Sequence, residues 1–452
     1  MFGWEFPPHI TGGLGTACYG LTRGLAEHGA EIIFVVPKAY GKEDERFVRI
    51  VNASEVEMPC GEAADNELWE QVSFMQINSN MLPYCTPEEF HMVAENFATT
   101  VENPATTEPH SDINPKQLSA HNPTEIPRGK ESGNVWRRRY EFSGSYGNNL
   151  HEEVRRYGVI AKHVATRLNG QFDVIHAHDW LTYYAGVAAK SVSGKPLAVH
   201  IHATEFDRSG KQINETIYAI ERFGMERADV VIAVSNLTRN IVIGHYGIPE
   251  HKVITVHNAV QFAARTEVQY PRVLKEKVVT FLGRVTSQKG PEYFVEAAAK
   301  VLKRRRDIRF VMAGDGDMLH RIIRRVAALG ISDRFHFTGF LRGAEVERMF
   351  ALSDVYVMPS VSEPFGISPL EAMRAGVPVI ISRQSGVSEI VNHAVKVDYW
   401  DVDGLADAIY GLTTYDTLAK ALSINGRAEV SAIKWKHAAA KILDIYERLT
   451  GC

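Results

Sequence analysis

The sequence predicts an α/β protein with two Rossmann-like, doubly wound domains that face each other across a cleft. Three observations support this prediction. Short apolar runs rich in β-branched residues alternate with amphipathic helical stretches. These runs fall into two series, of which one ends near residue 256 and the other starts at residue 278. A chain of 452 residues is also too long for a single ordinary hydrophobic core.

The predicted strands follow the apolar runs in order. In the first domain, expected over residues 1–262, they are residues 32–36, 173–176, 197–201, 230–234 and 253–256. In the second domain, expected over residues 263–428, they are residues 278–282, 308–312, 335–337, 355–357 and 377–381. Helical patterns lie between them, and the one at residues 318–329 is amphipathic with an arginine-rich outer face. Two such series predict two parallel sheets with the functional site in the cleft between them.

Residues 100–135 differ in composition from the rest of the chain. Asn, Pro, Thr, Glu, Ser and His dominate there, and the apolar residues show no periodicity. We therefore expect a disordered insertion in the N-terminal domain. Three arginines follow at residues 137–139, and we favour a solvated surface run over a contact with an anionic acceptor.

The overall composition argues against several classes of function. A net charge of −4 and an isoelectric point near 6.5 give no electrostatic basis for binding nucleic acid or an anionic membrane. No apolar run is long enough to predict an integral membrane segment, and the start of the sequence lacks the features of a signal peptide. The cysteines at positions 18, 60, 85 and 452 have no CxxC spacing, so neither disulfides nor a zinc site are expected. A cytoplasmic protein fits this composition.

The stretch from Glu363 to Glu371 is the strongest functional signal. A strand-like run at residues 354–358 precedes it, Phe365 and Gly366 lie in a turn, and a helical pattern begins at Glu371. A strand, a glycine-containing turn and a helix aim backbone N–H groups at an anion. A carboxylate at each end of the turn suits hydroxyl groups on either side of a phosphate, as in a nucleotide-sugar. The alternative is a buried strand-to-helix turn with two solvated glutamates.

A second candidate segment, residues 283–290, joins a predicted strand to a helical pattern that starts near Tyr293. Arg284 offers a planar fork for two phosphate oxygens, and Lys289 adds a compact positive charge. Open α/β sheets bind ligands at the carboxyl ends of their strands. We therefore favour a phosphate site that includes the backbone at Gly283 over two solvated cations.

Two glycine-rich loops are further candidates. Gly12, Gly13 and Gly15 open the first predicted helix, and Gly316 lies in a tight loop after the strand at residues 308–312. Glycine lets the backbone approach a phosphate or a sugar closely. A tight turn with no ligand is an equally good interpretation of both loops.

The histidines near the predicted strand ends are candidate ligands. His202 follows the strand at residues 197–201, at the edge where the site should lie, whereas His200 should pack inside. In an extended segment, His176, His178 and Asp179 alternate between faces. No third ligand group is evident, so no metal site is expected, and Asp179 is placed near the acceptor side of the cleft.

Together these motifs resemble the retaining glycosyltransferases of GT-B architecture, in particular the group that contains glycogen synthase and sucrose synthase. The residues that carry the resemblance are Gly12-Gly13-Leu14-Gly15, His176-Ala177-His178-Asp179-Trp180, His202, Gly283-Arg284, Lys289-Gly290, Gly314-Asp315-Gly316 and the pair Glu363 and Glu371. They extend from the first residues to about residue 390, so the resemblance covers nearly all of the chain.

The resemblance implies an activity and a role for each site residue. The chain would transfer a hexose, with glucose expected, from a nucleotide-sugar to a glycan or sugar acceptor, with retention of configuration. Arg284 and Lys289 would hold the diphosphate and Glu371 the ribose, while Glu363 and His202 would bind the hexose. The nucleotide-sugar is then a substrate, and no metal or other cofactor is expected.

Two features depart from the family pattern. Synthases that use ADP-glucose carry a lysine just before Thr-Gly-Gly, and this chain has Ile10 there, which argues against ADP-glucose. Only residues 2–6 can form a strand before the glycine loop, so the first strand is expected to be a stub, from a short strand or a misassigned start. The family also implies that residues 429–452 end in a helix packed against the N-terminal domain.

Other functions share parts of this pattern. An epimerase would bind the same donor but would need acid/base carboxylates beyond Glu363. A phosphorylase would need a cofactor-linked lysine, and Lys289 has the wrong context. A non-catalytic binding protein would be expected to lose one of the four charged residues. Among transferases, glucan elongation, disaccharide synthesis and decoration of a cell-envelope glycan remain open, and the sequence predicts no oligomeric state.

Overall fold

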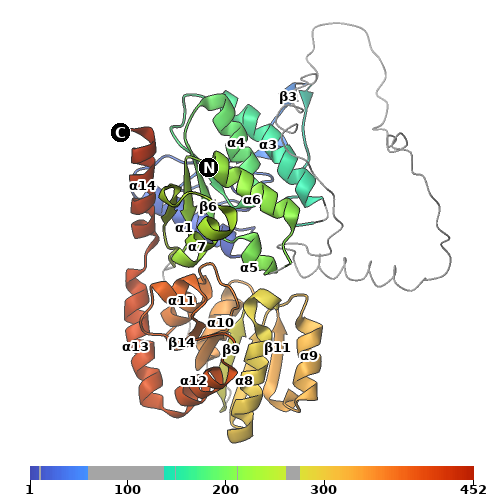
Figure 1. Cartoon of the computed structure of the whole chain (residues 1–452), viewed down its shortest axis with the longest axis vertical. Coiled ribbons are helices and arrows are strands. Elements are labelled where there is room, and N and C mark those ends of the chain that lie inside the picture. The colour runs from blue at the N-terminus through green and yellow to red at the C-terminus, as the bar shows by residue number, and fades with distance from the viewer. Residues whose placement is uncertain (10–11, 60–136, 148, 211, 261–274, 452) are drawn as a thin grey trace, which may run out of the picture.

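The structure, a computed structural model, describes residues 1–9, 12–59, 137–147, 149–210, 212–260 and 275–451. It contains two α/β domains, and the N-terminal one lies above the C-terminal one in Figure 1. The prediction of two parallel, doubly wound sheets is confirmed. The insertion expected at residues 100–135 and the boundary expected at residue 262 lie outside the described residues. Within the described part of the chain, no helix is long and apolar enough to cross a membrane.

A parallel sheet forms the centre of the N-terminal domain. Its strands are β1 (Ile33–Val36), β2 (Arg49–Asn52), β5 (Ile175–His178), β6 (Leu197–Ile201), β7 (Val230–Ala233) and β8 (Val253–Thr255). Strands β5 to β8 pair in sequence order, and β1 pairs with β2. Phe2 joins the two groups, because it forms parallel bridges with Val35 and with Ala177. The expected stub of a first strand is thus a single bridging residue. Strands β3 (Met58–Pro59) and β4 (Arg137–Arg138) form a separate antiparallel ribbon.

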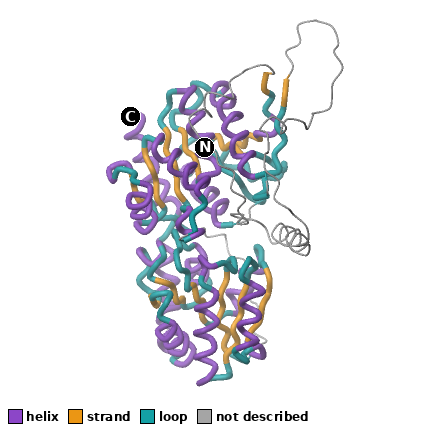
Figure 2. The backbone as a smooth tube through the Cα atoms, turned by 45° about the vertical axis from the view of Figure 1, so that its right-hand side comes forward, coloured by secondary structure: helices purple, strands orange, loops and turns teal. Residues whose placement is uncertain are grey.

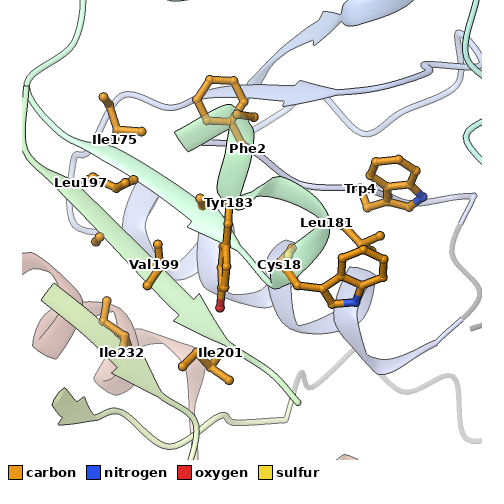
Figure 3. Close-up of a cluster of buried hydrophobic side chains, with 14 of the residues drawn as sticks. Phe2, Trp4, Cys18, Ile175, Leu181, Tyr183, Leu197, Val199, Ile201 and Ile232 are labelled. Carbon is orange, nitrogen blue, oxygen red and sulfur yellow. The ribbon is translucent and has the colours of Figure 1, made fainter. Parts of the chain in front are cut away.

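Helices flank the strands of both domains (Figure 2). Those of the N-terminal domain are α1 (Gly13–Ala26), α3 (Leu150–Arg167), α4 (Trp180–Ser193), α5 (Glu205–Ser209), α6 (Glu215–Arg227) and α7 (Asn236–Tyr246). Strands β5, β6 and β7 are buried along their whole length, which explains their continuous apolar runs. Figure 3 shows the middle of this core, where Cys18 of α1, Tyr183 of α4 and Val199 of β6 belong to one cluster.

The sheet of the C-terminal domain is also parallel, with the order β11-β10-β9-β12-β13-β14. Its strands are β9 (Lys277–Leu282), β10 (Ile308–Ala313), β11 (Phe335–Gly339), β12 (Val355–Met358), β13 (Val379–Ser382) and β14 (Val395–Val397). The sequence predicted all of these except β14, which is a short, half-buried edge strand without a strong apolar pattern. Strand order reverses between β9 and β12, and open α/β sheets bind ligands at this switch point.

The helices of the C-terminal domain alternate with these strands. They are α8 (Pro291–Arg304), α9 (Leu319–Ala328), α10 (Ala344–Leu352), α11 (Ile367–Arg374), α12 (Val402–Thr414) and α13 (Asp416–Ala432). The amphipathic pattern predicted at residues 318–329 corresponds to α9, whose Ile322 and Val326 are buried. The helix predicted from Glu371 onward already begins at Ile367, so Glu371 lies in the second turn of α11.

The last helix, α14 (Trp435–Thr450), returns to the N-terminal domain and packs on α1 (Figure 1). Two glycines of α1 make this contact possible. A Cβ at Gly20 would lie 2.2 Å from Nε1 of Trp435, and one at Gly24 would lie 2.8 Å from the Trp435 carbonyl oxygen. Between α13 and α14, Lys434 forms a parallel bridge with Val260. The chain therefore connects the two domains at positions that lie side by side.

Candidate functional site

Two loops meet at the switch point of the C-terminal sheet. One follows β9 and includes the single 3-10 turn Ser287–Lys289, and the other follows β12. The N–H of Val361 donates to the carbonyl oxygen of Gln288 at 2.8 Å. Gly290 has φ of 64°, and a Cβ there would lie 2.2 Å from the Pro359 carbonyl oxygen. Only glycine fits such a close approach in this conformation, so Gly290 fixes how the two loops meet.

Lys289 and Glu363 form an ion pair across this junction. Glu363 is 7% exposed, and its Oε2 also lies 3.3 Å from the hydroxyl oxygen of Ser360. Two of the predicted site residues, 74 positions apart in sequence, are therefore in direct contact. The cation and the carboxylate lie together where the fold places ligands.

The turn after Glu363 is held by the loop that follows β13. Gly386 N–H donates to the carbonyl oxygen of Glu363, and Val387 N–H donates to that of Phe365. Gly366 has φ of 97° and precedes α11 without a capping side chain. The first N–H groups of α11 thus have no side-chain cap at the helix terminus where an anion is best accommodated.

Glu371 is connected to the same site through Tyr356 of β12. Burial raises the pKa of the Glu371 carboxyl, against the opposing effect of Arg374. Tyr356 lies in the interior, and its hydroxyl donates to the Leu282 carbonyl oxygen at 3.3 Å. Burial raises the Tyr356 pKa, and the charges of both Glu363 and Glu371 contribute to the increase. Tyr356 therefore lies close to both carboxylates of the predicted pair.

Arg284 lies next to the loop after β10. The Asp317 carboxyl has a pKa raised by burial, which the positive charge of Arg284 partly offsets. The two loops are in backbone contact, since Val285 N–H donates to the carbonyl oxygen of Asp315 at 2.8 Å. A Cβ at Gly316 would lie 2.5 Å from the Val285 carbonyl oxygen. Gly316 thus permits the close contact between these loops.

The same contact continues at Gly283. A Cβ on Gly314 would lie 1.8 Å from the Gly283 carbonyl oxygen, whereas one on Gly283 itself would meet nothing within 4 Å. The N–H of Gly283 donates to the carbonyl oxygen of Ala313 at 3.0 Å. Gly283 therefore continues the backbone contact between β9 and β10 and presents an open face on its other side.

On the N-terminal domain, His202 follows β6 and is positioned by Asp179. The Asp179 carboxylate accepts the N–H of His202 at 3.2 Å and that of Ala203 at 3.4 Å. Asp179 has φ of 64°, the one positive φ of a non-glycine residue among the described residues. Such backbone strain persists only where surrounding contacts impose it, and it concentrates at functional sites. Asp179 is only 1% exposed, and its two hydrogen bonds orient the His202 loop.

Four histidines form a stacked ladder behind this loop. His178 Nδ1 lies 3.2 Å from His202 Nε2, and His176 Nε2 lies 3.2 Å from His200 Nδ1. Burial lowers the pKa of all four, that of His202 to about 3, so the rings are neutral at physiological pH. The expectation that no third ligand group lies nearby is wrong, because Cys18 lies beside His178 and His202. Neighbouring strands and α1 supply the groups that spacing along one strand could not reveal.

The glycine loop at the start of α1 has a partner that the sequence did not indicate. Glu5, 8% exposed, accepts the N–H of Gly15 at 3.0 Å. The N–H of Gly15 therefore has a carboxylate acceptor within the protein. A Cβ at Gly12 or Gly13 would meet nothing within 4 Å, so both glycines border open space.

The carboxyl ends of the two sheets are linked by hydrogen bonds that cross between the domains. The Ser362 hydroxyl donates to Oδ1 of Asp207 on α5 at 2.5 Å. Glu389 accepts the N–H groups of Asn236 and Leu237 at 2.9 and 2.8 Å. Helix α5 also lies against the segment that contains Lys289, so the loops that carry His202 and Lys289 share one interdomain boundary.

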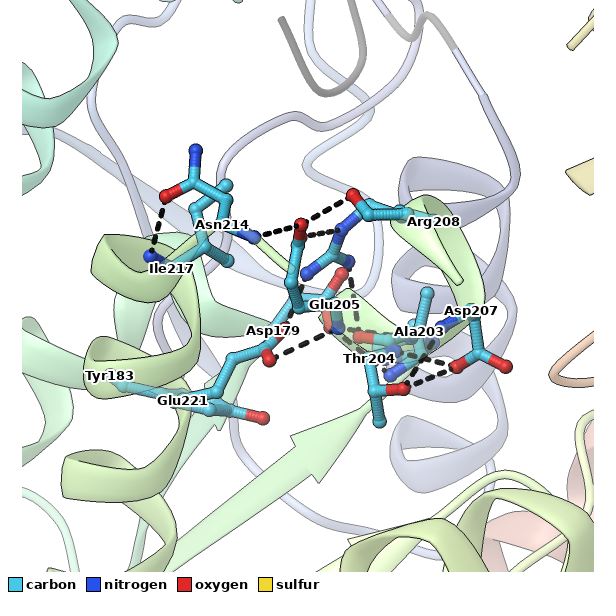
Figure 4. A network of polar contacts seen from close by, with 12 residues as sticks. Asp179, Tyr183, Ala203, Thr204, Glu205, Asp207, Arg208, Asn214, Ile217 and Glu221 are labelled. Atoms are coloured by element: carbon cyan, nitrogen blue, oxygen red, sulfur yellow. Dashed lines mark hydrogen bonds and ion pairs between the residues drawn. The ribbon is translucent and has the colours of Figure 1, made fainter. Parts of the chain in front are cut away.

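A buried network holds α5 in place (Figure 4). Arg208, whose side chain is 6% exposed, pairs with Glu205 at 3.2 Å and with Glu221 of α6. Thr204 donates its N–H and its hydroxyl to Oδ2 of Asp207, which leaves Oδ1 for Ser362. Sequence reasoning missed this network. The capping pattern of Thr204 and Asp207 was a local signal for the start of α5, but the partners on α6 were not visible in it.

Three family patterns match the chain in succession. Residues 1–107 match the family described as "Starch synthase catalytic domain", residues 115–263 match "Glycosyltransferase Family 4", and residues 264–429 match "Glycosyl transferases group 1". All three concern glycosyl transfer.

Among curated relatives, an uncharacterized glycosyltransferase of Methanocaldococcus jannaschii is 35% identical over 240 residues. That alignment covers 50% of this chain and 61% of the relative, so the chain spans about three fifths of that protein. The alpha-maltose-1-phosphate synthase of Mycolicibacterium smegmatis is 28% identical over 317 residues, which cover 62% of this chain and 79% of the relative. The glycogen synthase of Mycobacterium tuberculosis is 25% identical over 304 residues, which cover 64% of this chain and 72% of the relative.

Solved structures show the same fold along the whole chain. The sucrose-phosphate synthase of Thermosynechococcus elongatus superposes with a TM-score of 0.65 at 19% identity, covering 97% of this chain and 94% of that one. At this level of identity the similarity concerns the fold alone.

Proposed function

We propose that the chain is a glycosyltransferase of GT-B architecture, in the glycogen synthase-like group, and that it transfers a hexose from a nucleotide-sugar to a glycan or sugar acceptor. Glucose is the proposed hexose, and its anomeric configuration is retained. The observation that carries the proposal is the Lys289–Glu363 pair at the switch point of the C-terminal sheet. There a lysine that can bind a diphosphate contacts a carboxylate that can accept hydrogen bonds from sugar hydroxyls.

The donor would bind at the carboxyl ends of β9 and β12. Arg284 and Lys289 neutralise the diphosphate, and the first N–H groups of α11 add their partial positive charge. Glu371 accepts hydrogen bonds from the ribose hydroxyls. Fixed cations of this kind stabilise the negative charge that grows on the leaving phosphate without a metal ion.

The hexose would lie between Glu363 and His202. A neutral His202 can donate or accept a hydrogen bond, and burial keeps it neutral by lowering its pKa to about 3. The acceptor hydroxyl forms a bond to the anomeric carbon on the face from which the diphosphate departs. The bond to the phosphate oxygen breaks, and that oxygen takes the hydroxyl proton. The nucleoside diphosphate thus leaves with the proton of the acceptor hydroxyl, and the anomeric configuration is retained because the new bond forms on the face from which the diphosphate departs.

The relatives favour α-glucosyl chemistry over decoration of a cell-envelope glycan. Two of them are named as an alpha-maltose-1-phosphate synthase and a glycogen synthase. We therefore take a phosphorylated sugar or an α-glucan as the first candidate acceptor of this chain. Others are named as glycosyltransferases of 2-deoxystreptamine, which keeps a small cyclic acceptor as the second candidate.

A donor and acceptor screen tests the proposal. The full chain is incubated with UDP-, ADP- or GDP-glucose and with maltooligosaccharide, glucose 1-phosphate, 2-deoxystreptamine or no acceptor. We expect nucleotide release that depends on an acceptor, and a product whose anomeric proton coupling in NMR identifies an α-linkage. A β-linked product would contradict retention. Conversion of the donor sugar to its epimer without an acceptor would overturn transfer in favour of isomerisation.

A further inference from the structure

Cys18, His178 and His202 bring three metal-binding atoms together behind the hexose site. They come from α1, from the end of β5 and from the residue after β6, so the fold assembles them from three elements. The thiol sulfur of Cys18 and one ring nitrogen of each histidine lie within 4.8 Å of one another. His178 Nδ1 and His202 Nε2 are 3.2 Å apart. Two nitrogens bound to one tetrahedral zinc ion are about 3.3 Å apart, given Zn–N bonds of about 2.0–2.1 Å.

A buried nitrogen without a partner gives an independent indication. His178 is 0% exposed, and its Nε2 has no hydrogen-bond partner among the described residues. Nε2 of His200, which is 2% exposed and lies in the same ladder, is also without one. Buried polar atoms in native proteins are nearly always satisfied, and each exception requires an explanation. These unpartnered Nε2 atoms belong to the same ladder as the proposed ligands, so the buried rings of the cluster have nitrogens that the described part of the protein does not use.

Two carboxylates lie near the sulfur of this cluster. Burial lowers the pKa of His178 and His202, so both rings keep a lone pair available for a metal. Burial raises the pKa of the Cys18 thiol, and the negative charges of Glu5 and Asp179 raise it further. These two carboxylates therefore lie close enough to stabilise a positive ion at the sulfur. A bound ion would also lower the thiol pKa and take the thiolate as its ligand.

We propose that Cys18, His178 and His202 form an inhibitory binding site for a divalent transition metal of the zinc type. The ion forms bonds to the thiolate and to one nitrogen of each ring, the thiol proton leaves to solvent, and a water molecule completes a tetrahedral shell. The hydrogen bond between the two rings is lost. Of the two candidate ligand groups in the ladder, this one includes the half-buried His202, whereas all three residues of the other group are buried, so this group is the more accessible to an ion.

Inhibition follows from the position of His202. A metal-bound His202 cannot make its hydrogen bond to the hexose, so the ion competes with the donor. This part of the proposal depends on the proposed function, whereas binding of the metal does not. The two are tested by different readouts.

Cobalt binding tests the site without any assay of activity. Co²⁺ is titrated into the reduced full chain, and a tetrahedral site with a thiolate gives intense visible bands and a sulfur-to-cobalt charge-transfer band. We expect one equivalent of cobalt, displaced by Zn²⁺. The charge-transfer band should disappear in Cys18→Ser, and cobalt affinity should fall at least about tenfold in His202→Gln. The control His336→Gln, an exposed histidine of β11, should bind like the parent.

The variants also separate the possible outcomes. Circular dichroism and thermal unfolding establish that Cys18→Ser and His202→Gln are folded, and His202 is half-buried at the cleft edge, so its variant tolerates the change best. A band that is absent from the parent, or that persists in Cys18→Ser, would overturn the site. Cobalt binding without transferase activity would leave the site in place and remove the proposed function. Competitive zinc inhibition lost in Cys18→Ser, with metal-free activity kept, would support both.

Discussion

The hydroxyl of Ser362 donates a 2.5 Å hydrogen bond to the carboxylate of Asp207 and so joins the two domains one residue away from Glu363. Asp207 is only 2% exposed, and burial raises its pKa, which the bonds from Ser362 and Thr204 partly offset. The position of Glu363 therefore depends on a contact with the opposite domain.

Ser362→Ala should lower kcat/KM while the chain stays folded. The variant loses one hydrogen bond to a buried carboxylate, worth about 1.5–3 kcal/mol of stability. The resulting displacement of the neighbouring Glu363 should lower kcat/KM by about tenfold to 10²-fold. Steady-state kinetics with the donor identified in the screen measure the effect. Ser388→Ala is the control, because the Ser388 hydroxyl bonds only to carbonyl oxygens within its own loop. Equal effects of the two substitutions would contradict a special role for the interdomain bond.

Lys289→Ala should reduce kcat/KM about 10²- to 10³-fold, the loss of about 2.7–4 kcal/mol expected for one donor to a developing negative charge. Lys300→Ala on the same domain is the control, because Lys300 pairs with Asp403 on the exposed surface. Lys289→Ala also leaves the buried Glu363 without its cation, so the stability of this variant should fall. Adding Glu363→Gln should restore stability without restoring activity. Full activity of folded Lys289→Ala would refute the phosphate role.

Gly290→Ala should destabilise the protein more than Gly247→Ala does. Both glycines have a positive φ, 64° and 69°, so both substitutions carry the left-handed penalty of about 1–2 kcal/mol. Only the Cβ at Gly290 would collide with a backbone oxygen, whereas nothing lies within 4 Å at Gly247. The difference between the two free energies of unfolding, from urea titrations, measures the clash. We also expect Gly290→Ala, but not Gly247→Ala, to lose activity, because the added Cβ at Gly290 would push apart the two loops at the switch point.

The stability of the parent protein should depend on Glu221 as pH changes. Burial raises the Glu221 pKa from 4.5 to about 7 in the folded state, although Arg208 favours the charged form. Between these values the folded state binds more protons than the unfolded state, so this group's contribution is present below pH 4.5 and is lost as pH rises toward 7. Glu221→Gln should remove this component, and melting temperatures measured across that range should show a flatter profile. An unchanged slope would assign the pH dependence to other groups.

The sequence predicted the central strands, because burial on both faces requires continuous apolar runs. It did not predict the half-buried strands β2 and β14, which lack such runs. It also placed Lys289 and Glu363 in loops that follow strands of the sheet, as the structure has them. It could not show that these two side chains touch, because the order β9-β12 depends on strand pairing between distant segments.

Other parts of the site had no local signature at all. The carboxylate of Glu5 reaches Gly15 only through the fold of the N-terminal segment, and Asp179 adopts a positive φ that its neighbours impose. The histidine ladder combines alternation along each strand with the register that places His178 opposite His200. Spacing along one strand predicts the alternation of side chains but not the register between two strands.

The bridge between Val260 and Lys434 restricts how the molecule can move. Two domains that are connected at two adjacent positions can rotate about the line through those positions. Sliding or twisting of one domain against the other would break the bridge between the two positions. Opening would then be a hinge rotation about this bridge, so that the parts of the two domains farthest from the bridge separate most. Substrate would enter and leave from the side of the molecule opposite Lys434.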